Sequence, residues 1–252
     1  MGTVEAWSYL IFRKDWKMIT AIMVDGGFYR KRARHIFGEK SPPERASELY
    51  AYCCRHLKDK HEERNLYRIF YYDCPPSGKE VYNPIDKKNI QLNRSPVYKW
   101  ANDFFQELIK HRKVALRMGE VLESSVGYTL RPGSMKKLLQ RKIDIDDLTI
   151  SDFSLDFKQK GVDMRVGLDI ASLAHKRLVN QIVLIAGDSD FIPAAKHARR
   201  EGIDFILDPM WQDVKPSLLE HIDGLHSPVH RPGTPGKKDP LCVPEDISPF
   251  KI

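Results

Sequence analysis

Apolar segments of strand length alternate with longer amphipathic segments along most of this chain. Five short runs rich in aliphatic, β-branched and aromatic residues are typical of strands, at 19–24, 66–72, 114–118, 182–186 and 203–207. Helical spacing of apolar residues is found at 28–37, 44–60, 97–111, 162–178, 191–201 and 216–222. This alternation predicts an α/β fold, a three-layer sandwich with a mainly parallel central sheet of about five strands.

The same pattern suggests one large domain with a flanking segment at each end. Residues 1–17 are expected to be an N-terminal extension, 18–226 the domain, and 227–252, rich in proline and glycine, a disordered tail. Within the domain, about 121–160 is the least regular part and is expected to be an insertion. Its basic cluster suggests either a solvated hairpin or, in the sharper interpretation, a flap that contacts phosphates.

Charge and cysteine content narrow the class of protein. The net charge is +7 and the sequence pI is about 9.1, which favours a polyanionic partner such as nucleic acid. The four cysteines form no C-x-x-C pair, so no zinc ribbon is indicated, and a reducing, cytoplasmic location fits best. The apolar runs are too short for a membrane span, so no membrane partner is expected.

Five aspartates lie at or near the ends of the expected elements. Asp25 follows the first strand, Asp188 and Asp190 follow the fourth, and Asp163 and Asp169 lie in the segment before it. Ligands of open parallel sheets bind beyond the carboxyl ends of the strands. Carboxylates that converge there repel one another unless a cation neutralises them, so we expect a divalent-metal site and a phosphodiester substrate.

Each aspartate also has a simpler explanation. Asp25 and Asp163 are both plausible helix N-caps, and Asp188 and Asp190 are in a loop where solvent exposure is common. Asp169 lies six residues after Asp163, roughly 120° around a helix, which favours a supporting position over direct metal contact. The metal interpretation is preferred because several acids coincide at one expected edge of the sheet.

Three sequence segments, in this order, resemble the NYN family of PIN-like nuclease domains, with the LabA-like bacterial branch closest. They are Val24-Asp25-Gly26-Gly27-Phe28, Lys160-Gly161-Val162-Asp163 and Gly187-Asp188-Ser189-Asp190-Phe191. The resemblance covers about 19–225 and implies a PIN-like, Rossmann-like fold and a metal-dependent ribonuclease, most simply an endonuclease. It also implies that Asp25, Asp163 and Asp188 hold the metal, with Asp190 as the second acid of the loop and Asp169 as a helix acid common in the family. Phe28 departs from the family pattern, in which asparagine is frequent at this position.

The chemistry of the expected site is consistent with that resemblance. Mg²⁺ or Mn²⁺ prefers carboxylate oxygens, can activate a water and can stabilise charge on phosphoryl oxygens. No histidine or cysteine accompanies the aspartates, which argues against zinc. Candidate substrate contacts are Lys160, Arg30, Lys31 and Ser189, although a solvated basic helix face explains Arg30 and Lys31 equally well. Ser189 has no histidine nearby in the motif and is not expected to act as a nucleophile.

Two functions therefore stay open. The first is a metal-dependent ribonuclease, with RNA favoured over DNA only through the resemblance. The second is a PIN-like nucleic-acid-binding or adaptor module with weak or lost catalysis, which the departure at Phe28 favours. A haloacid-dehalogenase-type phosphatase fits poorly because Gly27 stands where a second aspartate is needed, and no phosphate-binding glycine motif is present. A homo-oligomer is possible on these data.

Overall fold

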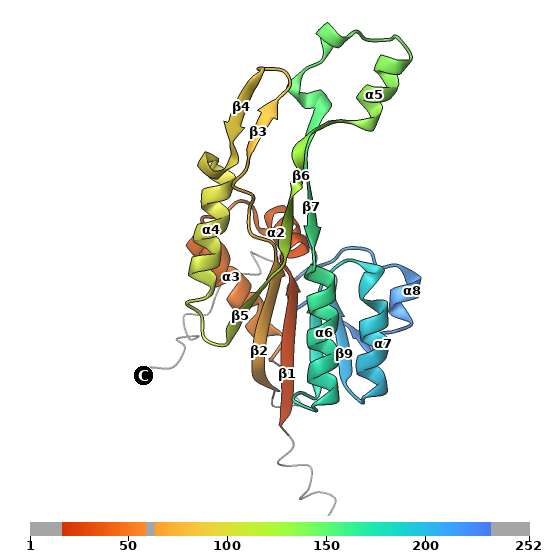
Figure 1. Cartoon of the computed structure of the whole chain (residues 1–252). Coiled ribbons are helices and arrows are strands. Elements are labelled where there is room, and N and C mark those ends of the chain that lie inside the picture. Colours follow the sequence, from red (N-terminus) through yellow and green to blue (C-terminus); the bar gives the residue numbers. More distant parts are fainter. Residues whose placement is uncertain (1–16, 59–63, 233–252) are drawn as a thin grey trace, which may run out of the picture.

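The computed structural model confirms the expected α/β sandwich (Figure 1). It describes residues 17–58 and 64–232. The central sheet is parallel throughout, with the strand order β10-β9-β8-β1-β2-β5. These strands are Gly224–Leu225 (β10), Asp204–Asp208 (β9), Gln181–Ile185 (β8), Met18–Asp25 (β1), Arg64–Asp73 (β2) and Val114–Met118 (β5).

Helices cover both faces of this sheet because alternate residues of each strand point to opposite sides. On one face, Ala21 and Met23 of β1 pack with α6 (Val162–His175) and α7 (Ile192–Arg200). On the other face, Ile22 and Val24 pack with the helices that follow β1 and precede β5. Those helices are α2 (Gly26–Phe37), α3 (Pro42–Arg55) and α4 (Pro96–Leu108). Apolar strands buried on both sides explain the nearly continuous hydrophobic runs in the sequence.

The strand order reverses beside β1. From β1 the chain builds outward through β2 and β5, and it then returns to the other side of β1 to form β8, β9 and β10. The switch point therefore lies between β1 and β8, whose residues Val24 and Ile185 are paired in register. In sheets of this kind the crevice beyond the carboxyl ends at the switch point is the usual ligand site.

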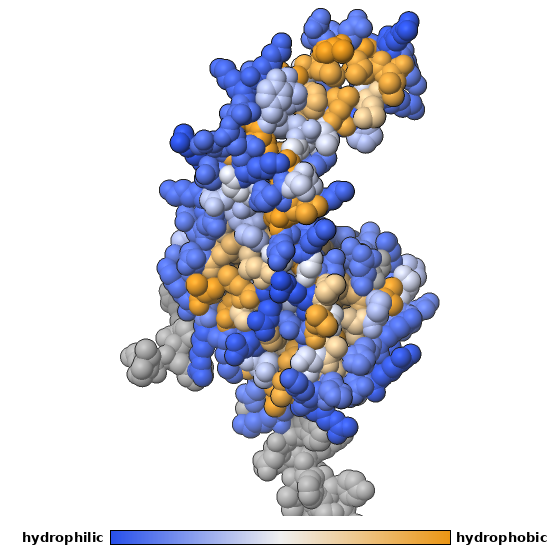
Figure 2. Space-filling view, viewed as in Figure 1, coloured by the Kyte–Doolittle hydropathy of each residue, from blue (hydrophilic) through white to orange (hydrophobic). Residues whose placement is uncertain are grey.

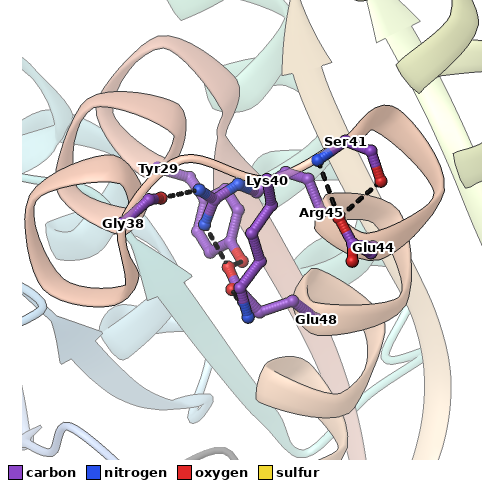
Figure 3. A network of polar contacts seen from close by, with 7 residues as sticks. All are labelled: Tyr29, Gly38, Lys40, Ser41, Glu44, Arg45 and Glu48. Atoms are coloured by element: carbon purple, nitrogen blue, oxygen red, sulfur yellow. Dashed lines mark hydrogen bonds and ion pairs between the residues drawn. The ribbon is translucent and has the colours of Figure 1, made fainter.

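A buried ionic network holds the turn between α2 and α3 (Figure 3). Glu48 accepts hydrogen bonds from the Tyr29 hydroxyl at 2.9 Å and from Arg45 at 2.5 Å, and its second oxygen lies 2.9 Å from the Lys40 ammonium. Arg45 also donates to the carbonyl of Gly38. The network therefore holds α2, the helix that begins directly after Asp25, in place.

Two hairpins extend beyond the carboxyl edge of the sheet (Figure 1). The shorter pairs β3 (Glu80–Asn83) with β4 (Lys88–Gln91), in a segment with no strand signal in the sequence pattern. The longer hairpin pairs β6 (Glu120–Leu130) with β7 (Phe153–Lys160). The helix α5 (Pro132–Leu139) comes between these two strands in the sequence. The segment expected to be an irregular insertion is thus an antiparallel hairpin, one of the two forms that its sequence suggested, with a register shift between Leu122 and Gly127. We call this hairpin the arm.

The chain departs from the expected organisation near its C-terminal end as well. A two-residue sixth strand, β10, extends the sheet and is too short to give a sequence pattern. Past the boundary expected at 226, Ser227 donates to Asp208 at 2.5 Å and Val229 is buried beside α3 and α4 in the core. Contacts of the domain therefore continue into the first residues of the expected tail. Residues 1–16 of the N-terminal extension expected at 1–17, and the rest of the expected tail at 233–252, lie outside the described residues.

Within the described residues, no helix has the length and apolar character needed to cross a bilayer. The short helix α8 (Pro216–Leu219), which precedes β10, is the last helix of the described chain.

A fully buried carboxylate ties the end of β9 to α3. Asp208 accepts hydrogen bonds from the Tyr52 hydroxyl at 2.6 Å, the Met210 amide at 2.8 Å and the Ser227 hydroxyl, and it lies 2.9 Å from His56 Nε2. A buried acid is tolerated because these donors replace its lost hydration.

We predict that Asp208→Ala lowers the free energy of unfolding by about 3 kcal/mol or more, because several buried donors lose their acceptor together. Urea denaturation measures this change, with Asp103→Ala on the exposed side of α4 as the matched control. A loss below about 1 kcal/mol would contradict a structural role for this network.

Candidate functional site

The switch point carries Asp25 as the last residue of β1. Its Oδ1 accepts a hydrogen bond of 3.1 Å from the Phe28 amide, so Asp25 is the N-cap of α2. The capping role and a role in the crevice coexist, because the cap occupies only one carboxylate oxygen. Asp25 is therefore a helix cap, as the simpler explanation expects, and it also lies at the switch-point crevice.

The loop after β8 presents the next two acids. Phe191 is buried in the core and anchors the far end of this loop, while Asp188 and Asp190 are exposed. Asp188 Oδ1 accepts a hydrogen bond of 3.3 Å from the Asp190 amide. At the near end, a Cβ on Gly187 would lie 2.5 Å from the Phe28 ring. The close approach of that ring therefore requires glycine at position 187.

Asp163 comes from the first turn of α6. The preceding Gly161 adopts a left-handed conformation with φ of 79°, which lets the chain turn sharply from β7 into the helix. Asp163 is exposed at this helix N-terminus, where the helix dipole favours a negative charge.

The electrostatics join these acids into one group. Burial raises the pKa of Asp25 above its usual value, and the nearby charges of Asp73 and Asp163 raise it further. The pKa of Asp163 is also raised, by partial burial first and then by the charges of Asp190 and Asp188. None of Asp25, Asp163, Asp188 or Asp190 has an ion-pair partner within the described residues. The charge of Asp163 thus links Asp25 to the two acids of the loop, and Arg30, which pairs with Asp73, is a base within electrostatic range of Asp25.

A further acid, Asp73, belongs to the same edge and is not among the site residues predicted from the sequence. It ends β2 as Asp25 ends β1, and that parallel position was the available signal. Its side chain is 1% exposed and lies 3.0 Å from Arg30, with further hydrogen bonds from the Tyr71 hydroxyl and the Cys74 amide. A Cβ on Gly26 would lie 2.5 Å from Asp73 Oδ2, so glycine is needed there too.

Burial raises the pKa of Asp73, and the Arg30 charge opposes that rise. Asp73 is thus a paired acid, unlike the four at the crevice. It holds a guanidinium within electrostatic range of Asp25, since the Asp25 charge also contributes to the raised pKa of Arg30.

Asp169 makes a different set of contacts from the other predicted acids. Its Oδ2 accepts hydrogen bonds of 2.9 Å from both the Tyr72 hydroxyl and Arg117 Nε. These contacts fasten α6 to β2 and β5. The angular separation from Asp163 anticipated in the sequence agrees with this supporting position.

The predicted substrate contacts are distributed around the acids. Arg30 is partly exposed and paired with Asp73, whereas Lys31, the next residue of α2, is exposed. Lys160 is exposed at the last position of β7, three residues before Asp163. Ser189 belongs to the short 3-10 turn Ser189–Phe191, and its side chain lies outside the part of the structure that is described.

The donor set suits a hard divalent cation, since it consists of carboxylate oxygens without nitrogen or sulfur ligands. The carboxylates are nevertheless spread apart: in the described part of the chain, no three acidic, histidine or cysteine side chains lie close enough together to hold one ion.

Comparison with known proteins identifies one family. The chain matches the NYN domain over residues 85–217, which include Asp163, Asp188 and Asp190 but begin after Asp25. The NYN family is part of the PIN-like nuclease superfamily. No curated protein matches the chain significantly. Among solved structures, a protein of unknown function from Vibrio parahaemolyticus aligns over 84% of this chain and 93% of its own, with 13% identity and a TM-score of 0.44.

We predict that Asp25→Asn makes the metal-free protein more stable at neutral pH, because asparagine keeps the cap acceptor and removes a charge that is disfavoured first by burial and then by the nearby Asp73 and Asp163. A carboxyl whose pKa is raised on folding lowers the stability above its folded pKa and has no such cost below its unfolded pKa of about 3.9. The gain should therefore shrink as the pH falls into that acidic range.

Chemical denaturation in EDTA at several pH values measures this difference, with Asp103→Asn on α4 as the control. Equal stability of Asp25→Asn and the unmodified chain at neutral pH would contradict the proposed repulsion.

Proposed function

The chain belongs to the NYN domain family, and we propose that it is a metal-dependent ribonuclease that cuts RNA internally at the carboxyl edge of β1 and β8. Family membership indicates a nuclease-type module. The single observation that supports this site is the group of acids at the switch point, Asp25, Asp163, Asp188 and Asp190, none of which forms an ion pair within the described residues. The charge of Asp163 acts on Asp25, and the charges of Asp188 and Asp190 act on Asp163. Such an arrangement costs stability and is useful only where a cation binds.

We infer that these four aspartates hold Mg²⁺ or Mn²⁺. A bound ion of this kind would supply an activated water and would neutralise charge on the phosphoryl oxygens. Asp25 and Asp188 each use only one oxygen in the hydrogen bonds described, so the second oxygen of each is left for the ion. Asp169, held by Tyr72 and Arg117, would support the site by fixing the orientation of α6.

The chain's own basic residues would bind the substrate. Arg30 has 27% of its side chain exposed and is held by Asp73, which limits the rotamers of its guanidinium before RNA arrives. The guanidinium can donate to a phosphate while it keeps its contact with Asp73, because it carries five N–H groups. Lys160, Lys31 and Ser189 would provide further polar contacts around the acids, and RNA is proposed as the substrate on the family resemblance.

A nucleic-acid-binding module without catalysis is the second candidate, and Phe28 favours it. The Phe28 ring lies against Gly187 at the start of the acidic loop, where many relatives carry a polar asparagine. An apolar ring at that position removes a polar contact beside the proposed metal ligands. The two candidates differ in whether the acids are needed for cleavage.

We predict that the purified chain cleaves labelled single-stranded RNA in Mn²⁺ or Mg²⁺, that EDTA abolishes cleavage, and that Asp188→Asn lowers the rate at least about a hundredfold. Asp103→Asn is the matched control on a distant helix. The variant should still bind RNA, because it removes a negative charge from the crevice.

Binding without any metal-dependent cleavage would reject the ribonuclease proposal in favour of the binding module. A metal-induced rise in melting temperature that disappears in Asp188→Asn gives a second readout for the metal site, independent of turnover.

We also predict that Arg30→Ala weakens RNA binding about tenfold and reduces the salt dependence, with the slope of log affinity against log salt smaller by about 0.7 for one lost phosphate contact on a single strand. Arg34→Ala, one turn further along α2 and exposed, is the control. An unchanged salt slope in a folded Arg30→Ala protein would contradict a phosphate contact.

A further inference from the structure

The far end of the arm has no core of its own. We define the arm tip as the segment 131–152 between β6 and β7, which includes α5. None of its residues is buried, and α5, at eight residues, buries no side chain. An isolated helix of this length is marginal in water, so it needs tertiary packing or a partner.

Apolar side chains nevertheless gather at the arm tip. Leu139 is 78% exposed and Ile145 is 75% exposed, and Met135 and Ile150 are each 46% exposed. Figure 2 shows a continuous hydrophobic area over the end of the arm. Single exposed apolar residues are ordinary, but a contiguous group of them marks an interaction surface.

The charges around these apolar residues indicate what covers them. From Glu120 to Lys160 the arm has seven basic and seven acidic residues, so the whole excess positive charge of the chain lies outside the arm. A polyanion is therefore attracted to the rest of the molecule and not specifically to the arm. A neutral, partly apolar surface is better suited to a protein partner.

The two signs are also separated along the arm tip. Lys136, Lys137, Arg141 and Lys142 come first and are followed directly by Asp144, Asp146 and Asp147, all of them exposed. A surface with a basic cluster beside an acidic cluster is complementary to itself after a two-fold rotation. Each basic cluster then faces the acidic cluster of the other copy, as an isologous interface requires.

We propose that the arm tip is the interface of a homodimer, in which two copies of this chain bury the side chains of Met135, Leu139, Ile145 and Ile150 against each other. The basic and acidic clusters set the antiparallel orientation of the two arms. This interface is separate from the acidic crevice at the switch point, so it does not depend on the proposed nuclease activity.

Sedimentation equilibrium of the full chain over a range of concentrations tests the dimer directly. We expect the unmodified chain to be dimeric, and we expect Leu139→Glu and Ile145→Glu each to raise the dimer dissociation constant about tenfold or more, through the loss of apolar burial and the added charge. At concentrations low enough for the unmodified chain to be monomeric, the melting temperatures of the variants and the unmodified chain should be equal, because neither side chain contributes to the core. Leu219→Glu, an exposed apolar residue distant in sequence from the arm, is the control.

Charge reversal tests the two-fold arrangement itself. Lys136→Glu combined with Lys137→Glu makes the arm tip acidic, and Asp146→Lys makes it more basic, so each variant alone should dimerise more weakly. An equimolar mixture of the two variants should recover association as a heterodimer, because unlike clusters again face each other.

Several results would overturn the proposal. They are a monomeric chain at every concentration reached, a dimer unaffected by Leu139→Glu and Ile145→Glu, and variants whose mixture associates no better than each alone. Binding of the monomer to anionic vesicles or to RNA through the same apolar residues would likewise replace the second copy with a different partner.

Discussion

The repulsion among carboxylates at one edge of the sheet is the constraint on which the rest of this structure depends. Parallel strands bring their carboxyl ends to the same edge, and β1 and β8 are neighbours at the switch point. Asp25, Asp188 and the nearby Asp163 therefore lie at the same edge whether or not their charges favour it. The free-energy cost of bringing these charges together is offset by a core of strands buried on both faces. Alternate side chains of these strands pack against helices on the two sides.

Acids that have ion-pair partners and acids that have none are distributed differently in the described structure. Elsewhere in the domain, buried or partly buried acids have partners: Glu48 has Arg45, Asp73 has Arg30, and Asp169 has Arg117. Asp208 has His56, two hydroxyls and an amide. The fold thus satisfies these acids with hydrogen bonds and ion pairs, whereas the four crevice acids, where we propose that a cation binds, form no ion pair within the described residues. Two glycines, Gly26 and Gly187, permit the close approaches that support this edge.

The arm differs from the rest of the domain in its charge balance and in its packing. It rises from the same edge as the acids, yet its charges balance and its apolar side chains have no core to enter. The excess positive charge of the sequence lies outside the arm, and the proposed site for a polyanion is in the body of the domain. On the two proposals made above, nucleic acid would bind mainly to the body of the domain and a second copy of the chain would bind to the arm tip.

The sequence determined the fold class and most elements, because strand and helix periodicities are local properties of consecutive residues. It also indicated Asp25, Asp163, Asp188 and Asp190 through family resemblance and through their positions at element ends. The tertiary structure alone decided which acids lie within electrostatic range of one another and that Asp73 lies at this edge, paired with Arg30. It also decided that Asp169 accepts hydrogen bonds from Tyr72 and Arg117. It also decided that the segment expected to be irregular is a hairpin arm. These features depend on contacts between residues far apart in the chain, which leave no periodic pattern in the sequence.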